Sequence, residues 1–411
     1  MTSKTNTKKP SGNRILIISE RFFPEEFIIN DLVSELKNRG LVCDVLTQAP
    51  SYPYGKVSVY PGYKNKFFSV GFWNDIKIYR IMTIQGYRES KFKKVFNYLH
   101  FAIVCSIVLL FIGRKYNKIL VFHSGPLTVA TPAIIGKKIF RTTNTIWSLD
   151  LWPDAIYMYG FKQSRLNKFL LDRFVKTIYH QFDAIYCSSP AFSKRLNHYV
   201  NSKPINTLLQ WPQITIDKLT NEKTILEKGF FHFTFTGNIA WTQNLENVIL
   251  GFSLAQKEFP KIRLNIFGDG SNLDYLKRLT REKGIANVFF WGRVPLKEMP
   301  AIYNQSNVLV ISLQPDPVYE LYVPLKFSTY LAFSKPIFAI MNGVVSELTV
   351  NNKIGIVASP SSPEEICKGF VNLGSMGQQQ LDQFSLNSSG LLENQFSREK
   401  NINILFEELI S

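Results

Sequence analysis

The chain has 411 residues, of which 45% are hydrophobic and 19% are charged. This composition excludes a disordered chain, and the length is sufficient for two ordinary domains with a core in each. Aromatic residues reach 14% and the formal net charge at pH 7 is +17, which favours polyanionic partners such as nucleic acid, an anionic membrane surface or a pyrophosphate ligand.

The first half of the chain has the pattern of a parallel α/β domain. Residues 1–13 are polar without an apolar core, so we expect a disordered tail rather than a signal peptide. Apolar runs at 14–19 and 42–47, with a helical pattern over 26–39 between them, predict a strand–helix–strand unit. Further strands are predicted at 76–81, 118–122, 143–148 and 184–188.

The segment 98–113 is the most hydrophobic part of the chain, and cations flank it on both sides. Its uncharged core, Phe101 to Ile112, would cover roughly 18 Å as a helix, against a hydrocarbon thickness of about 30 Å, so it is short for a transmembrane span. An apolar helix between cations is typical of an element that lies among anionic lipid headgroups. We therefore predict contact with an anionic membrane through residues 88–118; the alternative is a helix packed on the first sheet.

The chain changes character after Gln210-Trp211-Pro212, where a polar and charged stretch runs to Gly229. We place the domain boundary there, with a first domain at 14–212, a second at 213–394 and a terminal amphipathic helix within 395–411. Strands of the second domain are predicted at 232–236, 263–267, 288–291, 308–313, 336–339 and 355–357, and helices at 245–258, 273–283, 300–304, 326–332 and 363–373. The four cysteines lie in or beside apolar runs, without the spacing of a metal site, as expected of buried thiols in a cytosolic protein (Cys43, Cys105, Cys187 and Cys367).

Two strands of the second domain end at glycine, in the segments Phe233 to Asn238 and Leu264 to Gly270. Glycine at the end of a parallel strand lets the backbone approach an anionic ligand, and the helix that follows directs its positive end at a phosphate. The chain has no H-E-x-x-H, no His/Cys cluster and no D-x-D, so a metal-free phosphate site is expected. Its candidate groups are the turn at Gly237 and Asn238 and the cations Arg293 and Lys326.

Acidic and aromatic residues follow two strands of the first domain. Asp150 comes just after the strand at 143–148, and Trp152 beside it could stack on a sugar ring. Glu20 and Glu25 follow the first strand in the same way. The alternative for Asp150 is a turn cap.

Taken together, the segments resemble the family 4 retaining glycosyltransferases of the GT-B fold, in the bacterial surface-polysaccharide branch of N-acetylfucosaminyl-transferase-like and colanic-acid-type proteins. The similar segments run in family order over nearly all of residues 14–410: 22–25, 50–53, 124–127, 150–154, 236–239, 268–270 and 323–332. The resemblance implies an α/β protein of two facing Rossmann-like domains, with a C-terminal helix that crosses back to the first.

The resemblance also implies a function: retaining transfer of a sugar from a nucleotide donor, for which we expect UDP, to a saccharide acceptor. We expect the acceptor to be linked to a lipid diphosphate, because this explains both the cations and the apolar helix. The expected location is cytoplasmic, peripheral on the inner face of the cell membrane, with no metal and no cofactor. The implied sites are catalytic (Asp150, Lys326), donor-binding (Gly237, Asn238, Gly268, Arg293, Val294, Glu320, Pro324, Thr329) and acceptor-binding (Glu20, Glu25, Trp152).

The sequence departs from the family pattern at two places. Many members carry two glutamates eight residues apart where this chain has Leu321 and Thr329, with Glu320 one place away. The common Arg/Lys pair after the glycine turn is absent, and Asn238 and Gln243 stand nearby. These departures leave two alternatives: a catalytically silent subunit and a GT-B-fold nucleotide-sugar epimerase. A nucleic-acid binder is disfavoured because the basic run flanks an apolar helix.

Overall fold

The computed structural model describes residues 13–158, 163–200, 203–213 and 225–411, and these form two compact units. The first unit comprises residues up to Leu208 together with Asn401–Ser411, and the second comprises Leu209–Lys400. The sequence placed the corresponding boundaries at 212/213 and 394/395. The predicted tail lies, apart from Asn13, outside the described residues.

The first unit is built on an eight-stranded sheet with the order β3-β4-β2-β1-β5-β6-β7-β8. All neighbouring pairs are parallel except β3 with β4. The strand order reverses between β1 and β5, which is the arrangement of a doubly wound sheet. The strands are β1 (Arg14–Ser19), β2 (Val42–Gln48), β3 (Phe68–Trp73), β4 (Ile76–Ile81), β5 (Lys118–His123), β6 (Thr143–Ser148), β7 (Ala184–Cys187) and β8 (Ile205–Thr207).

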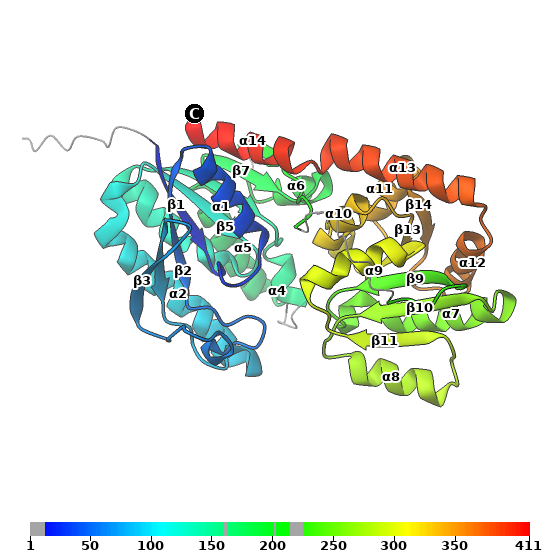
Figure 1. Cartoon of the computed structure of the whole chain (residues 1–411). Coiled ribbons are helices and arrows are strands. Elements are labelled where there is room, and N and C mark those ends of the chain that lie inside the picture. Colours follow the sequence, from blue (N-terminus) through cyan, green and yellow to red (C-terminus); the bar gives the residue numbers. More distant parts are fainter. Residues whose placement is uncertain (1–12, 159–162, 201–202, 214–224) are drawn as a thin grey trace, which may run out of the picture. The chain divides into compact units, whose positions relative to one another are not determined.

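Helices flank this sheet, and the last helix of the chain belongs to the same unit (Figure 1). In α14 (Arg398–Ile410), Ile402, Leu405 and Leu409 are buried, as the amphipathic pattern predicts. Tyr186 donates from its hydroxyl to Glu408 over 3.0 Å, which ties α14 to β7. The other helices are α1 (Ile28–Asn38), α2 (Lys91–Ile112), α3 (Thr131–Ile135), α4 (Asp154–Met158), α5 (Arg165–Tyr179) and α6 (Pro190–Leu196).

The second unit holds a six-stranded parallel sheet with the order β11-β10-β9-β12-β13-β14, which reverses between β9 and β12. Its strands are β9 (Phe231–Thr236), β10 (Ile262–Phe267), β11 (Val288–Gly292), β12 (Val308–Ser312), β13 (Ile337–Ile340) and β14 (Gly355–Ala358). Its helices are α7 (Leu245–Glu258), α8 (Leu273–Glu282), α9 (Met299–Gln305), α10 (Leu325–Ala332), α11 (Val344–Asn351), α12 (Pro363–Gly374) and α13 (Gln378–Gln395).

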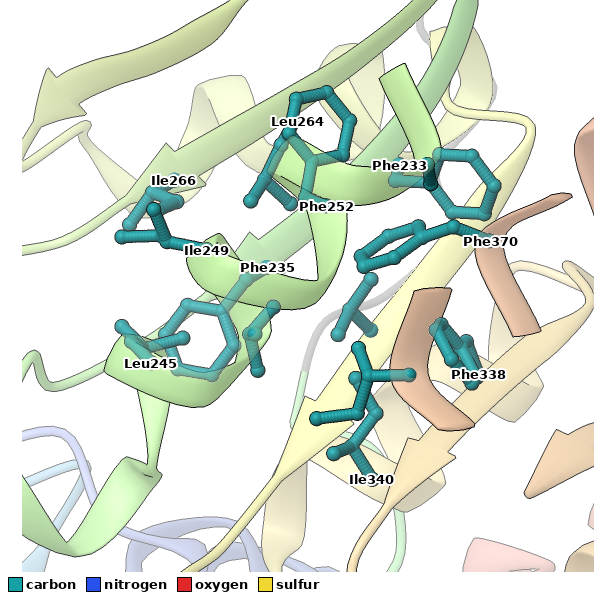
Figure 2. Packing of buried hydrophobic residues seen from close by; sticks show 14 of the residues in the cluster. Phe233, Phe235, Leu245, Ile249, Phe252, Leu264, Ile266, Phe338, Ile340 and Phe370 are labelled. Atoms are coloured by element: carbon teal, nitrogen blue, oxygen red, sulfur yellow. The ribbon is translucent and has the colours of Figure 1, made fainter. Parts of the chain in front are cut away.

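The core of the second unit is centred on Phe370 of α12 (Figure 2). Its ring meets Phe233 of β9 edge-on at 4.7 Å, Phe338 of β13 at 5.0 Å and Phe252 of α7 at 5.3 Å between ring centroids. Edge-to-face contacts of this kind add to the burial of the rings. The cluster therefore fixes two helices against two strands of one sheet.

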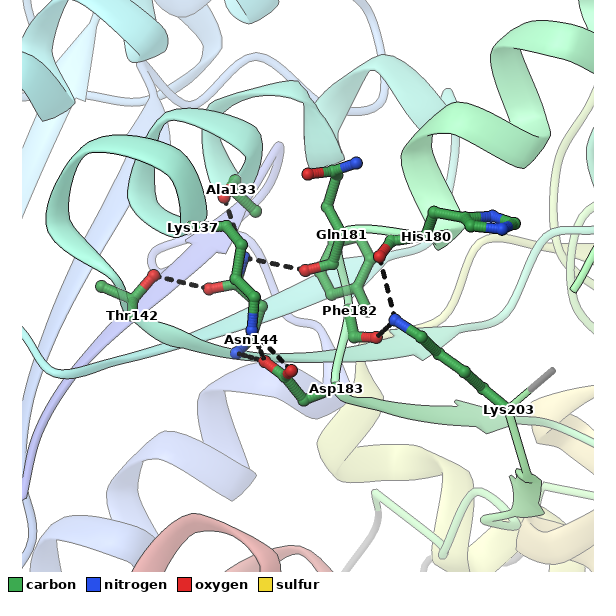
Figure 3. A network of polar contacts seen from close by, with 9 residues as sticks. All are labelled: Ala133, Lys137, Thr142, Asn144, His180, Gln181, Phe182, Asp183 and Lys203. Atoms are coloured by element: carbon green, nitrogen blue, oxygen red, sulfur yellow. Dashed lines mark hydrogen bonds and ion pairs between the residues drawn. The ribbon is translucent and has the colours of Figure 1, made fainter.

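A polar network fastens the first sheet at the amino-terminal ends of β6 and β7 (Figure 3). The Asn144 side chain donates to the Ala133 carbonyl over 2.8 Å, and its backbone amide donates to the Asp183 carboxylate over 2.8 Å. Lys137 pairs with that same carboxylate. Since these partners are used within the fold, this edge is structural, and the opposite edge is the one available for ligands.

We expect Phe370→Ala to lower the free energy of unfolding of the second unit by about 3 to 5 kcal/mol, because it leaves a cavity under three aromatic rings. Urea denaturation measures the loss. Leu386→Ala, at an exposed position of α13, is the control and should change stability by no more than about 0.5 kcal/mol. Equal losses in both variants would contradict the importance of the aromatic cluster.

Candidate functional site

The two glycine turns of the second unit lie at the carboxyl ends of neighbouring strands β9 and β10. Gly237 and Gly268 have φ angles of 132° and 138°, a region that favours glycine. A Cβ at position 268 would lie 1.8 Å from the carbonyl oxygen of Gly237, so no other residue fits there. The amides of Gly237 and Gly268 donate to Phe267 and Gly292, which leaves the exposed Asn238 amide as the candidate phosphate donor in this turn.

Lys326 lies at the start of α10, across the point where the strand order reverses between β9 and β12. Its Nζ lies 4.0 Å from the centroid of the Phe235 ring and donates to the Gln243 side-chain oxygen over 2.7 Å. A Cβ on Gly237 would be 3.1 Å from the same Nζ, so this cation adjoins the glycine turn. Burial lowers the pKa of Lys326 to about 7, since its hydrogen-bond partner is a neutral amide.

The other predicted donor residues are spread along the same edge of the sheet. Arg293 and Val294 follow β11, which lies two strands from β9 and therefore about 10 Å away at the usual strand spacing. Glu320 accepts from Asn342 over 3.3 Å and packs against Gly343, just after β13. Pro324 is the N-cap of α10.

Thr329 lies within α10 and is buried. Its hydroxyl donates to the Leu325 carbonyl one turn earlier over 3.3 Å, so its proton is used within the helix.

Within the described residues, no group of three or more His, Cys, Asp or Glu side chains is placed to hold a metal ion. The groups that the structure does bring together at the β9/β12 reversal are a lysine, a glycine turn and a helix N-terminus. Such a combination neutralises phosphate oxygens by charge and dipole.

The first unit contains a pocket of about 670 Å³ at the corresponding reversal, between β1 and β5. Arg21 reaches it from the end of β1, Gly125 from the end of β5, and Asp150 with Trp152 from the end of β6. The remaining walls come mainly from α2 and its preceding loop and from α5. A pocket of this size suits a small molecule or a sugar.

Asp150 is only partly exposed, and burial raises the pKa of its carboxyl to about 7. Arg21 and Lys94 oppose that rise and Glu20 adds to it. Although burial alone would lower the pKa of Arg21, Glu20 and Tyr87 hold it above its ordinary value. Asp150 therefore changes charge near neutral pH beside a permanent cation, as is common for carboxyl groups in functional sites.

A buried network positions Asp150 and Trp152, and in it the Ser148 hydroxyl donates to the backbone carbonyl of Asp150 over 3.4 Å. His123 contacts the Ser148 hydroxyl at 2.8 Å and the Gly125 carbonyl at 2.9 Å, and the Trp152 ring nitrogen donates to that carbonyl over 3.0 Å. Burial lowers the pKa of His123 to about 3, so the imidazole is neutral and structural. Trp152 presents its ring to the pocket from a fixed position.

Neither of the two predicted acceptor glutamates is among the residues that line this pocket. Glu25 is buried and accepts the backbone amides of Ser51 and Tyr52 over 2.8 and 2.7 Å, so its carboxylate holds a loop. Glu20 is also buried, but its Oε2 has no hydrogen-bond partner in the described part of the chain. Arg21 lines the pocket and was missed, although a cation directly after the first strand is a signal that the sequence carries.

Comparison with known proteins gives a family match for part of the second unit. Residues 217–382, within the second unit, match the family model described as "Glycosyl transferases group 1". The Pseudomonas aeruginosa protein described as "Probable glycosyltransferase WbjE" is 30% identical over 159 residues, which are 36% of this chain. The chain spans 38% of the length of that relative in the match.

Two solved structures share the architecture over nearly the whole chain. Sucrose-phosphate synthase from Thermosynechococcus elongatus has a TM-score of 0.71 at 14% identity, over 97% of this chain and 99% of that one. Anabaena HepE, solved with UDP and glucose, has a TM-score of 0.69 at 14% identity with the same coverage. At this identity the likeness shows the fold, and it confirms the predicted GT-B class of two parallel α/β units.

Proposed function

We propose that this chain, which has the GT-B fold and whose second unit matches glycosyl transferases group 1, is a metal-independent retaining glycosyltransferase of the hexosyltransferase type. The donor is a nucleotide sugar, expected to carry UDP, and the acceptor is a saccharide on a lipid diphosphate, used in bacterial surface polysaccharide or glycan assembly. The observation that carries the proposal is the meeting of Lys326, the Gly237 turn and the N-terminus of α10 at the β9/β12 reversal.

At this point the donor diphosphate replaces Gln243 as the partner of Lys326. Among the residues that the structure describes, no carboxylate pairs with the Lys326 ammonium, so a phosphate oxygen would stabilise the charge that burial disfavours. The glycine turn allows the backbone to approach the same phosphate. Arg293, after β11, lies two strands from β9, and Glu320 lies near the end of β13, one strand from β12. Both distances suit the rest of the nucleotide sugar.

In the proposed reaction, negative charge develops on the leaving diphosphate. The acceptor oxygen forms a bond to the sugar C1 while the bond from C1 to the phosphate oxygen breaks, and the acceptor proton passes to that departing oxygen. Lys326 and the α10 dipole stabilise the charge on the leaving diphosphate. On the acceptor side, Asp150 orients the reacting hydroxyl and Trp152 packs on the sugar face.

Residues 88–118 support a location on an anionic membrane, on the cytoplasmic face. Helix α2 is long and apolar enough to cross a membrane, with a mean hydropathy of 2.3 over 18 residues, of which 39% are buried. One side of it, with Phe101, Cys105 and Leu109, packs inside the unit. The other side is apolar yet exposed, with eight residues 40% to 89% accessible along one stripe: Phe92, Val95, Phe96, Leu99, Ile103, Ile107, Leu110 and Phe111. A helix that is apolar on all sides but buried on only one side is typical of an element that lies on a lipid surface.

Binding of UDP should be accompanied by proton uptake at Lys326. At pH 8 the unliganded ammonium, with a pKa near 7, is mostly neutral; phosphate favours its charged form, so uptake approaches one proton and falls towards pH 6. Affinity then falls by up to about tenfold per pH unit above neutrality. Calorimetry in buffers of different ionisation enthalpy measures the proton uptake. We expect Lys326→Met to abolish this uptake and Lys277→Met, an exposed change on α8, to preserve it. Unchanged uptake in Lys326→Met would remove the lysine from the donor site.

Asp150→Asn should reduce transfer to the acceptor by about 100-fold or more while UDP binding stays within twofold, because the change keeps the shape of the side chain but removes its ionisation. At saturating donor, the rate of the native enzyme should rise with pH as Asp150 ionises near pH 7. Rates are followed by chromatography of the glycosylated lipid. A converted nucleotide sugar formed from donor alone would instead support an epimerase, and no turnover of any donor would support a silent subunit.

Replacing Phe96 and Phe111 together by Asp should weaken binding to vesicles containing phosphatidylglycerol at least tenfold, since both rings are exposed and would otherwise enter the lipid. Leu386→Asp, an exposed apolar residue of α13, is the matched control and should bind as the native chain does. Vesicle sedimentation measures both. Equal binding of the double variant and the native chain would exclude α2 as the contact.

A further inference from the structure

We propose that the 670 Å³ pocket of the first unit binds the diphosphate group of the lipid carrier, with the apolar chain leaving the pocket between α2 and α5. This inference rests on the proposed function and assigns the carrier a specific site. The pocket has a cationic end, formed by Arg21, Arg88 and Lys94, and an apolar end, formed by Val95, Leu99, Leu171 and Phe174.

The cationic end is built around the ring of Tyr52. The guanidinium of Arg21 lies 4.6 Å from the ring centroid and that of Arg88 lies 5.2 Å from it, so both cations flank one aromatic ring. The Arg21 group also lies 5.3 Å from the Phe27 ring, and its Nε is buried without a hydrogen-bond partner in the described residues. A preorganised pair of guanidinium groups matches the oxygens of a diphosphate.

Lys94 completes this end, from the first turns of α2. Burial lowers its pKa, and the neighbouring Arg88 and Arg21 lower it further, while Glu20 and Asp150 act in the opposite direction. The cations therefore repel one another in the ligand-free pocket. Of the carboxylates that line the pocket, Glu89 is paired with Lys56 at 2.8 Å, and Asp150 offsets the repulsion only in part, since the pKa of Lys94 is still lowered. A doubly anionic ligand would offset the remaining repulsion.

The apolar end connects the pocket to the lipid-facing surface. Val95 and Leu99 line the pocket and also belong to the exposed stripe of α2. On α5, Leu171 and Phe174 line the pocket, and the preceding turn exposes Leu166, Phe169 and Leu170 at 66%, 61% and 52%. Residues three and four apart share a face of a helix, so α5 carries a second apolar surface beside the same opening.

The position of the reactive groups fits such a ligand. Asp150 and Trp152 line the same pocket as the two arginines, so a sugar attached to the diphosphate would lie against them. Four cations line the pocket against two carboxylates, and this excess of positive charge favours two phosphates over the single phosphate of a bilayer phospholipid (Arg21, Arg88, Lys91 and Lys94; Glu89 and Asp150). The apolar opening explains why the carrier would enter from the membrane rather than from water.

Farnesyl diphosphate is a soluble probe for this site, titrated into the full chain without donor and followed by calorimetry. We expect it to bind at least tenfold more tightly than either inorganic diphosphate or farnesol, because the pocket accommodates both ends. Arg88→Met and Leu99→Asp, at exposed positions, should each weaken binding at least tenfold. Lys138→Met, an exposed cation away from the pocket, should leave it unchanged. Arg21→Met should have the largest effect, and the Arg88 variant decides the matter if Arg21→Met fails to fold.

Three results would overturn the assignment: binding no tighter than that of inorganic diphosphate, an Arg88→Met variant with native affinity, or displacement of the probe by short-chain phosphatidylglycerol at equal concentration, which would make this a phospholipid site. UDP binding measured on the same samples separates this inference from the proposed function. Retained UDP binding with no probe binding would refute the pocket alone. Probe binding without any nucleotide-sugar turnover would refute the glycosyltransferase alone.

Discussion

The structure depends on one constraint of parallel sheets, which is that all strands end at the same edge. In both units the strand order reverses once, between β1 and β5 and between β9 and β12, and the loops that leave those strands diverge. The space between diverging loops is where a ligand can meet backbone and helix termini without displacing a core residue. The polar network around Asn144 and Asp183 lies at the other edge, where its groups are used within the fold. The topology of the sheet therefore places the candidate ligand-binding groups at one edge and the groups that stabilise the fold at the other.

Each reversal point carries an ionisable group whose charge burial disfavours. Lys326 is desolvated beside Phe235 with an amide as its partner, and Asp150 is desolvated beside a cation and another carboxylate. A protein interior tolerates such groups when their stabilisation comes from a ligand, since the unliganded state lacks the compensating charge. The two groups have opposite charges when ionised: Lys326 suits an anionic ligand, and Asp150 suits a hydroxyl that donates a hydrogen bond to it.

The sequence predicted most of the regular structure because buried parallel strands read as continuous apolar runs. The bounds of β1, β4, β6 and α7 agree with the sequence prediction to the residue, and α14 lies within the predicted range 395–411. The edge strand β3 was missed because its side chains are alternately exposed and half-buried at the margin of the sheet, so it lacks a continuous buried apolar run. Helix α13 was missed because it is rich in Gln, Ser and Asn and buries only three residues. The side chains of the site were harder to predict. Glu25 looks like Glu20 in sequence, yet loop 51–52 engages its carboxylate, and only the folded loop reveals this.

The long helix α2 shows why composition alone could not decide between core and membrane. One face of α2 is buried within the first unit, and this packing explains why Phe101, Cys105 and Leu109 are apolar. It does not account for Phe92 and Phe111, which are 89% and 82% exposed and would be polar on a helix in contact with water alone. A second apolar surface on α5, at the mouth of the same pocket, has no role in the packing of the unit either. The two surfaces together, next to a cationic pocket, make physical sense if the substrate of this unit is itself part of a membrane.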